Sequence, residues 1–160
     1  MSATITDVDS GYQSAVRKLS ALAGKKYVVV GVRSAKGTSR APGAHLNLAE
    51  IATVNEYGSS DGRIPERSFL RGTFDQNRQK YTGLVDAAVS RLTDPAGGSD
   101  VDRELGLLGL VVVGDVQQAI AAGVGPANAQ STRDRKGSSK QLVDTGRLRA
   151  SIDHEVREGS

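Results

Sequence analysis

The stretch VDRELGLLGLVVVGDVQQAIAA, residues 101–122, decides the fold class, because it is compatible with either a strand or a helix. Its β-branched run favours a strand, and its three glycines disfavour a helix. Strands are rarely longer than about eight residues, whereas helices commonly exceed ten, so the length of its apolar pattern favours a helix. That pattern keeps steps of three and four throughout, at Val101, Leu105, Leu108, Val112, Val116, Ala119 and Ile120.

The segments before this stretch carry signals for a helix, a strand and two further helices. A helix capped by Asp9 or Ser10 is expected to extend to about residue 23. The β-branched run of residues 26–34 predicts a buried strand, and the Gly-, Pro- and Arg-containing residues 35–45 predict a loop. Helical spacing returns over residues 46–57 and ends at a glycine.

A long helix is expected from about residue 66 to residue 92, followed by the helix-breaking sequence DPAGGS at 94–99. After the stretch 101–122, residues 123–141 are rich in Gly, Ser and charge and predict a long flexible loop. The alternation of SIDHEV, residues 151–156, predicts an edge or half-buried strand.

The order of these elements indicates an α+β fold, because no repeat and no strand–helix–strand alternation is found. We expect a small mixed or antiparallel sheet packed with several helices. Residues 9–157 would form a single domain that contains the loop 123–141, and residues 1–8 would form a flexible N-terminal arm.

Composition adds a hint of oligomerisation. Only 38% of the 160 residues are hydrophobic and 4% are aromatic, while nineteen are glycines. A domain with so few large apolar residues is a good candidate for completing its stabilisation against neighbouring subunits.

The net charge of +3 is unevenly distributed. Six basic residues against two acidic ones lie between positions 132 and 149, namely Arg133, Arg135, Lys136, Lys140, Arg147 and Arg149 against Asp134 and Asp144. Two interpretations stay open for this segment: a solvated loop, or a surface that faces DNA or an acidic protein rim.

Residue patterns of known catalytic and metal sites are missing from the sequence. The absence of cysteine excludes disulfides and thiolate metal sites, and neither His45 nor His154 belongs to a ligand pair. The triplet Asp144-Thr145-Gly146 also occurs in aspartic proteases, but that chemistry needs a second such carboxylate and a largely β chain. We therefore expect no enzymatic activity, no cofactor and no metal.

Targeting signals are also missing. The first ten residues lack a basic region followed by an apolar one, so no secretory signal is expected. The longest nearly uncharged stretch, residues 105–113, is shorter than the ~20 residues that a bilayer requires. These features predict a soluble, cytoplasmically made protein without a membrane partner.

Two segments carry a more specific signal: VNEYGSSDGRIPERSFLRGTFDQN, residues 54–77, and TRDRKGSSKQLVDTGRLRASIDHEV, residues 132–156. Together they resemble a pattern of tailed-bacteriophage tail-completion and neck proteins of the minor tail protein Z and virion-morphogenesis type. The matching residues are Asn55, Glu56, Tyr57 and Gly58, then Ile64, Pro65, Arg67, Phe69 and Leu70, and finally Leu142, Asp144, Thr145, Gly146, Leu148, Ser151 and Ile152.

The physical interpretation of the first motif is structural. Gly58 can end a helix, and Pro65 can occupy the first turn of the next one. Arg67, one turn before Arg71, can hold Glu56 or a carboxylate of a neighbouring subunit, and Phe69 can serve as a core or interface anchor.

In the second motif, Asp144 can accept backbone N–H groups and Gly146 can adopt a positive φ, which directs Leu148 towards the body of the domain. The two motifs provide the candidate assembly residues. These are Glu56, Tyr57, Arg67, Phe69, Arg71, Asp144 and Arg147.

The resemblance implies a structural virion protein that forms a homo-oligomeric ring, with sixfold symmetry favoured. The ring would join or cap the tail at the head–tail interface. Its partners would be tail terminator, tail tube or head–tail connector proteins and possible genomic DNA in the channel, with assembly in the host cytoplasm. The alternatives are a tail terminator or head-closure protein and, from another class, a basic DNA-binding accessory protein.

Overall fold

The computed structural model describes residues 26–40, 45–94, 97–125 and 146–159, together with positions 13, 16, 17 and 20. Those four positions are helical, in agreement with the helix expected before residue 23. The expected arm 1–8 and residues 126–141 of the expected loop lie outside the described residues.

The central element is helix α6, Val101–Ala122, and it confirms the helical interpretation of this stretch. The side chain of Asp100 caps its start by accepting the N–H of Arg103 at 2.8 Å. At its end, the N–H of Gly123 donates to the carbonyls of Ala119 and Ile120 at a φ of 90°.

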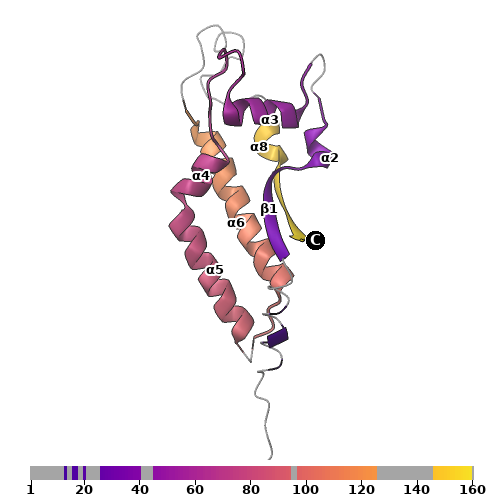
Figure 1. Cartoon of the computed structure of the whole chain (residues 1–160), viewed down its shortest axis with the longest axis vertical. Helices are drawn as coiled ribbons and strands as arrows, with labels where there is room; N and C mark the ends of the chain where they lie inside the picture. Colours follow the sequence, from indigo (N-terminus) through magenta and orange to yellow (C-terminus); the bar gives the residue numbers. More distant parts are fainter. Residues whose placement is uncertain are drawn as a thin grey trace, which may run out of the picture.

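Among the described residues, two antiparallel strands form the sheet, β1 (Lys26–Val32) and β2 (Ile152–Glu158), and they pair from Lys26 opposite Glu158 to Val32 opposite Ile152. Both strands pack against α6 (Figure 1). The predicted first strand is two residues too long, because the carbonyl of Arg33 accepts the N–H groups of Lys36 and Gly37. These bonds start the short helix α2, Ser34–Gly37, inside the predicted loop.

Helix α3, Leu48–Tyr57, lies across one end of α6 (Figure 1). Its start is fixed by a capping box, in which Asn47 and Glu50 each accept the backbone N–H of the other. The helix ends as predicted at Gly58, which has a φ of 81°.

The prediction of one long helix over residues 66–92 is wrong. The chain forms α4, Arg71–Gln76, and α5, Arg78–Thr93, with a break at Asn77. Pro65 is therefore not in a first helical turn, because residues 66–70 are not helical and the N–H of Arg67 donates to the carbonyl of Asn55 at 2.7 Å. Phe74, in α4, is 47% exposed.

Helix α8, Arg147–Ser151, leads directly into β2. Gly146 precedes it with the predicted positive φ, here 70°, and Leu148 is buried as expected. The helices and the antiparallel sheet confirm the α+β class. The main core cluster joins α3, α6, α8 and β2 through Ala52, Phe69, Val116, Ile120, Leu148 and Ile152.

Helix α6 is long and apolar enough to cross a membrane, a property that the core helices of soluble proteins share. Here it packs against β1, β2 and α5. Two of its acidic residues are paired across the interface with α5, Glu104 with Arg91 and Asp115 with Lys80. Within the described chain, α6 is therefore the element around which the sheet and helices α4, α5 and α8 are arranged.

Candidate functional site

A buried carboxylate organises the first sequence motif. Glu56 follows Ala52 by one turn of α3, so both side chains lie on the buried face of the helix. The Glu56 side chain is almost fully buried, with 3% of the residue exposed. It accepts the N–H groups of Leu70 and Arg71 at 2.9 and 3.0 Å and the hydroxyl of Ser68 at 2.8 Å. These bonds join the end of α3 to the start of α4.

This arrangement makes Glu56 the cap of α4 from a distant part of the chain. The first N–H groups of a helix have no partner within the helix, and Leu70, at the N-cap position, makes no capping bond with its own side chain. The carboxylate of Glu56 supplies acceptors for two of them, and its negative charge also suits the positive end of the helix dipole. The break before α4 is thus stabilised by a residue fifteen positions upstream of Arg71.

Arg71 balances the charge of Glu56. Its Nε donates to Glu56 at 3.2 Å, and its Nη2 donates to Glu66 at 2.7 Å. The bond with Glu56 raises the pKa of Arg71 above its usual value. Arg71, one turn after Arg67, thus holds the carboxylate of Glu56.

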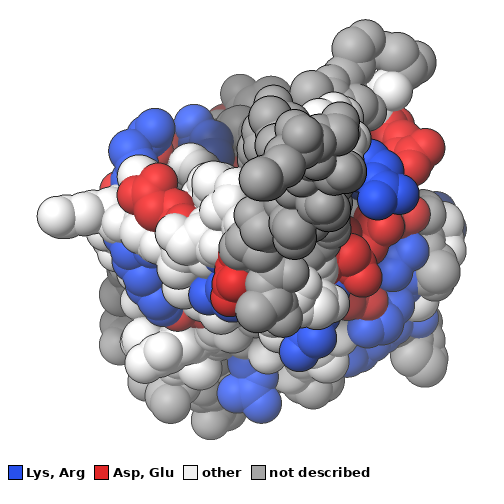
Figure 2. Space-filling view, turned by 90° about the horizontal axis from the view of Figure 1, so that it is seen from below, with Lys and Arg blue, Asp and Glu red and all other residues white. Residues whose placement is uncertain are grey.

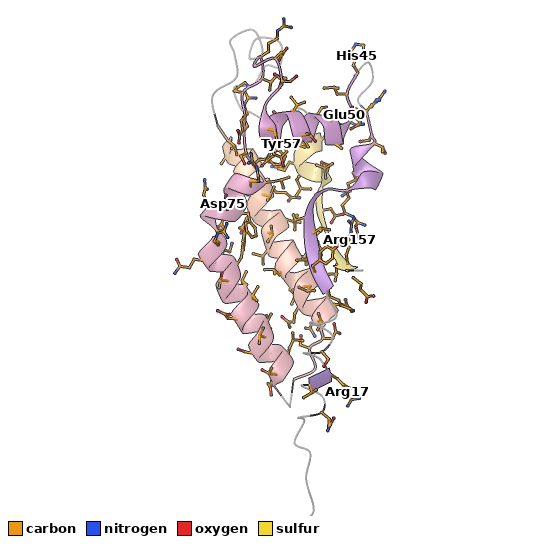
Figure 3. The ribbon with its side chains drawn as sticks, viewed as in Figure 1. Arg17, His45, Glu50, Tyr57, Asp75 and Arg157 are labelled. Carbon is orange, nitrogen blue, oxygen red and sulfur yellow. The ribbon has the colours of Figure 1, made fainter. Side chains whose placement is uncertain are left out.

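The outer side of this cluster is exposed and aromatic. Tyr57, at the end of α3, is 62% exposed (Figure 3). The guanidinium of Arg71 lies 4.7 Å from the ring centroid of Tyr57. A cation stacked on a ring with a carboxylate beside it offers a partner protein an apolar and a charged contact together. We call Tyr57, Glu66 and Arg71 the stacked surface.

A compact loop follows α3 and leads towards α4. The N–H of Ser59 donates to the carbonyl of Ile64, and the hydroxyl of Ser59 donates to Asp61 at 2.6 Å, which lowers the pKa of Asp61. Gly58 is required at the loop's start, because a Cβ there would lie 3.1 Å from the Ile64 carbonyl oxygen at a positive φ.

Besides Glu56, two candidate assembly residues are interior to the subunit. Phe69 is fully buried in the core cluster, and Arg67 is only 6% exposed. Burial lowers the pKa of Arg67, and Gly125 packs so closely that a Cβ there would lie 3.1 Å from Cγ of Arg67. Arg67 lies before α4 and does not begin a helix.

The second motif places Arg147 near α2, where its Nη2 donates to the hydroxyl of Ser39 at 3.4 Å. Asp144 lies outside the described residues, and so does the predicted DNA-facing group of Arg133, Arg135, Lys136 and Lys140. On the face shown in Figure 2, acidic and basic side chains are interspersed over the described part of the molecule, without a continuous basic area.

Two further buried polar pairs were not expected from the sequence. Glu104 accepts Nη2 of Arg91 at 2.6 Å and a short bond from Ser99, and the bond with Arg91 is the main cause of its lowered pKa. Asp115 accepts the hydroxyl of Tyr81 at 3.0 Å. The sequence contains a signal for these two pairs. Glu104 and Asp115 each lie three or four residues from members of the apolar stripe of α6, so their side chains face inward and need a polar partner there.

These carboxylates connect elements of the fold. Each accepts hydrogen bonds from Arg, Tyr, Ser or backbone N–H donors. Among the described residues, no three His, Cys, Asp or Glu side chains lie close enough together to hold a metal ion.

Comparison of the chain with protein-family models, with curated proteins and with solved structures finds no match.

Proposed function

We propose that this chain is a structural subunit of a tailed bacteriophage, a ring-forming tail-completion or neck protein. The subunit joins or caps the tail at the head–tail interface. In this role it works through complementary surfaces between copies and with neighbouring virion proteins, and it catalyses no reaction.

The observation that carries the proposal is the convergence of the two motif segments. Phe69 of the first motif and Leu148 and Ile152 of the second share one core cluster with α6, although about eighty positions separate them in sequence. Residues that match a family pattern and also meet in space support a common scaffold better than two independent sequence matches do.

The roles of the motif residues also suit an assembly protein. The buried ones hold the backbone: Glu56 caps α4, and Phe69 fills the core. Tyr57 and Arg71 remain exposed on the stacked surface, where a neighbouring protein can reach them. Buried supports with exposed aromatic and arginine contacts are typical of protein–protein interfaces.

The proposal is tested by deleting the coding sequence from the phage or prophage that carries it and examining the lysate by electron microscopy. We expect filled heads and separate tails with few joined particles, and recovery of joined particles when the chain is supplied from a plasmid. Normal numbers of infectious, joined particles without the chain would refute the proposal.

A DNA-binding accessory protein would behave differently in solution. It would bind duplex DNA as an isolated monomer, with an affinity that falls steeply with salt concentration. We expect weak or no duplex binding by the isolated subunit at physiological salt, which a fluorescence-anisotropy titration measures. Tight, salt-sensitive binding by the monomer would favour the accessory-protein role instead.

A further inference from the structure

An apolar groove runs between strand β1 and helices α4 and α5. Its volume is about 470 Å³, its floor is α6, and its walls are β1 on one side and α4 with α5 on the other. The side chains that line it include Val28 and Val30 of β1, Phe74 of α4, and Leu108, Val112 and Val116 of α6.

The groove's apolar surface extends along α5. Tyr81 lines the groove, and Val85 and Val89 follow it at intervals of four residues, so the three form one stripe. Phe74, Val85 and Val89 are all exposed. An exposed apolar surface of this kind on a soluble subunit is typical of an interaction site.

A second exposed apolar feature lies on the opposite side of α6. Leu107 and Leu110, which we call the leucine ridge, are 45% and 57% exposed. Gly106 and Gly114 flank them, and a Cβ at either glycine would meet no neighbouring atom. The leucines therefore project beyond a low backbone surface that another chain can approach closely.

Helix geometry sets the angle between the two features. Leu108, Val112 and Val116 point into the groove, whereas Leu107, Leu110 and Gly114 form the outer stripe. At 100° per residue, the centres of these two stripes are about 170° apart around α6. One subunit thus carries a concave and a convex apolar surface on opposite sides.

We propose that the leucine ridge of one copy docks in the groove of the next copy, as the repeated contact of a homo-oligomer. This inference rests on the proposed ring function and names its interface. A contact between two different surfaces of identical chains is heterologous, and it closes a ring when the rotation between neighbours divides a full turn. A single contact of this type covers both exposed apolar surfaces of every subunit.

The choice of a second copy follows from the chain itself. Both halves of the contact are present in each molecule, and a partner of another kind would cover only one of them. The low apolar content of the sequence makes the exposure of Phe74, Val85, Leu107 and Leu110 more notable. These are large apolar residues that the subunit does not use in its own core.

The test uses one variant for each surface, Leu110→Asp on the ridge and Phe74→Asp in the groove. Multi-angle light scattering after size exclusion measures mass at micromolar concentration, and circular dichroism confirms folding. We expect the unmodified chain to be an oligomer and each variant to be a monomer. Leu107→Asp serves as a second ridge variant, and the exposed Leu46→Asp, in the segment before α3, is the matched control that leaves the oligomer intact.

Mixing the two variants separates a heterologous contact from a symmetric one. Leu110→Asp retains an intact groove and Phe74→Asp an intact ridge, so one contact can form between them but no ring can close. We expect a species of twice the 16.7 kDa chain mass and nothing larger. A monomeric unmodified chain, variants that stay oligomeric, or a mixture that yields no dimer would each overturn the inference.

Cross-linking locates the contact directly, because the chain has no cysteine of its own. Phe74→Cys mixed with Leu110→Cys should give a disulfide-linked dimer, whereas Phe74→Cys mixed with Leu46→Cys should not. Equal cross-linking in both mixtures would contradict the docking of ridge in groove. These solution results do not depend on the particle assay, so a failure of this interface and a failure of the phage role are told apart.

Discussion

Replacing Glu56 with alanine should destabilise the subunit more than any other single loss of an acidic side chain in α3. The substitution removes one buried carboxylate that accepts two backbone N–H groups, the Ser68 hydroxyl and Arg71. A net value of about 1.5–3 kcal/mol applies to a hydrogen bond with a charged group, and such bonds are not additive when they share one acceptor.

The two backbone N–H donors account for most of the expected loss of stability. The N–H groups of Leu70 and Arg71 lose their acceptor at the start of α4, where the N-cap residue, Leu70, has no polar side chain to replace it. We therefore expect Glu56→Ala to lower the free energy of unfolding by about 3–4 kcal/mol. For a chain of this size, the melting temperature should fall by roughly 10 °C. Glu56→Gln keeps one acceptor oxygen but turns an NH₂ group towards donors, so about half of that loss is expected.

Urea unfolding followed by circular dichroism measures these differences, with Glu50→Ala as the matched control. Glu50 is a glutamate of the same helix, exposed, and bonded only within the capping box, so its loss should cost about 0.5–1 kcal/mol. Hydrogen exchange adds a local measurement, because the amides of Leu70 and Arg71 should lose protection in Glu56→Ala. If the Glu56 and Glu50 variants unfold at the same urea concentration, the capping role assigned to Glu56 is refuted.

Three further predictions concern the packing around α6. Gly109→Ala should destabilise the fold by about 1–3 kcal/mol in thermal unfolding, because the new Cβ would lie 2.5 Å from Cδ2 of His154. Gly114→Ala should instead stabilise the fold by about 0.5–1 kcal/mol, because its new Cβ would have no atom within 4 Å. The folded-state pKa of Glu104 is lowered, chiefly by Arg91, so the stabilisation by its carboxylate is present above the unfolded pKa and is lost as pH falls through the folded pKa. The difference in urea midpoint between the unmodified chain and Glu104→Gln should therefore shrink below about pH 4.5. A difference that stays constant with pH would contradict this. Burial, and to a smaller extent Asp115, raises the pKa of Tyr81 from 10.0 to about 12. The neutral Tyr81 hydroxyl therefore stabilises the fold below the unfolded pKa, and this stabilisation is lost as pH rises through the folded pKa. In a spectrophotometric titration, Tyr81→Phe should remove the last tyrosine to ionise.

Local patterns were sufficient for the elements whose signals lie within one segment. The apolar spacing of residues 101–122 predicted α6, because an amphipathic period of this length is incompatible with a strand. Gly58 and Gly146 were predicted correctly, since a chain reversal at a positive φ requires glycine whatever lies around it. The β-branched run at residues 26–34 indicated β1, although nothing in that run specified that β2 would be its partner.

The candidate site depended on contacts that no local pattern contains. Helical spacing alone continued from residue 66 to residue 92, yet Glu56 and the carbonyl of Asn55 hold residues 67–70 out of the helix until α4 begins at Arg71. Arg67 and Arg71 are equally suitable partners for a carboxylate by residue type, and only the packing of α3 against α4 brings Arg71 to Glu56 and buries Arg67. In the sequence, Gly109 is a residue of low helix propensity. In the folded chain, the absence of a side chain at Gly109 leaves room for the ring of His154 in β2. Sequence periodicity reports which face of an element is apolar; which side chain of another element meets that face is decided by the tertiary packing, because that choice depends on distances between residues far apart in the chain.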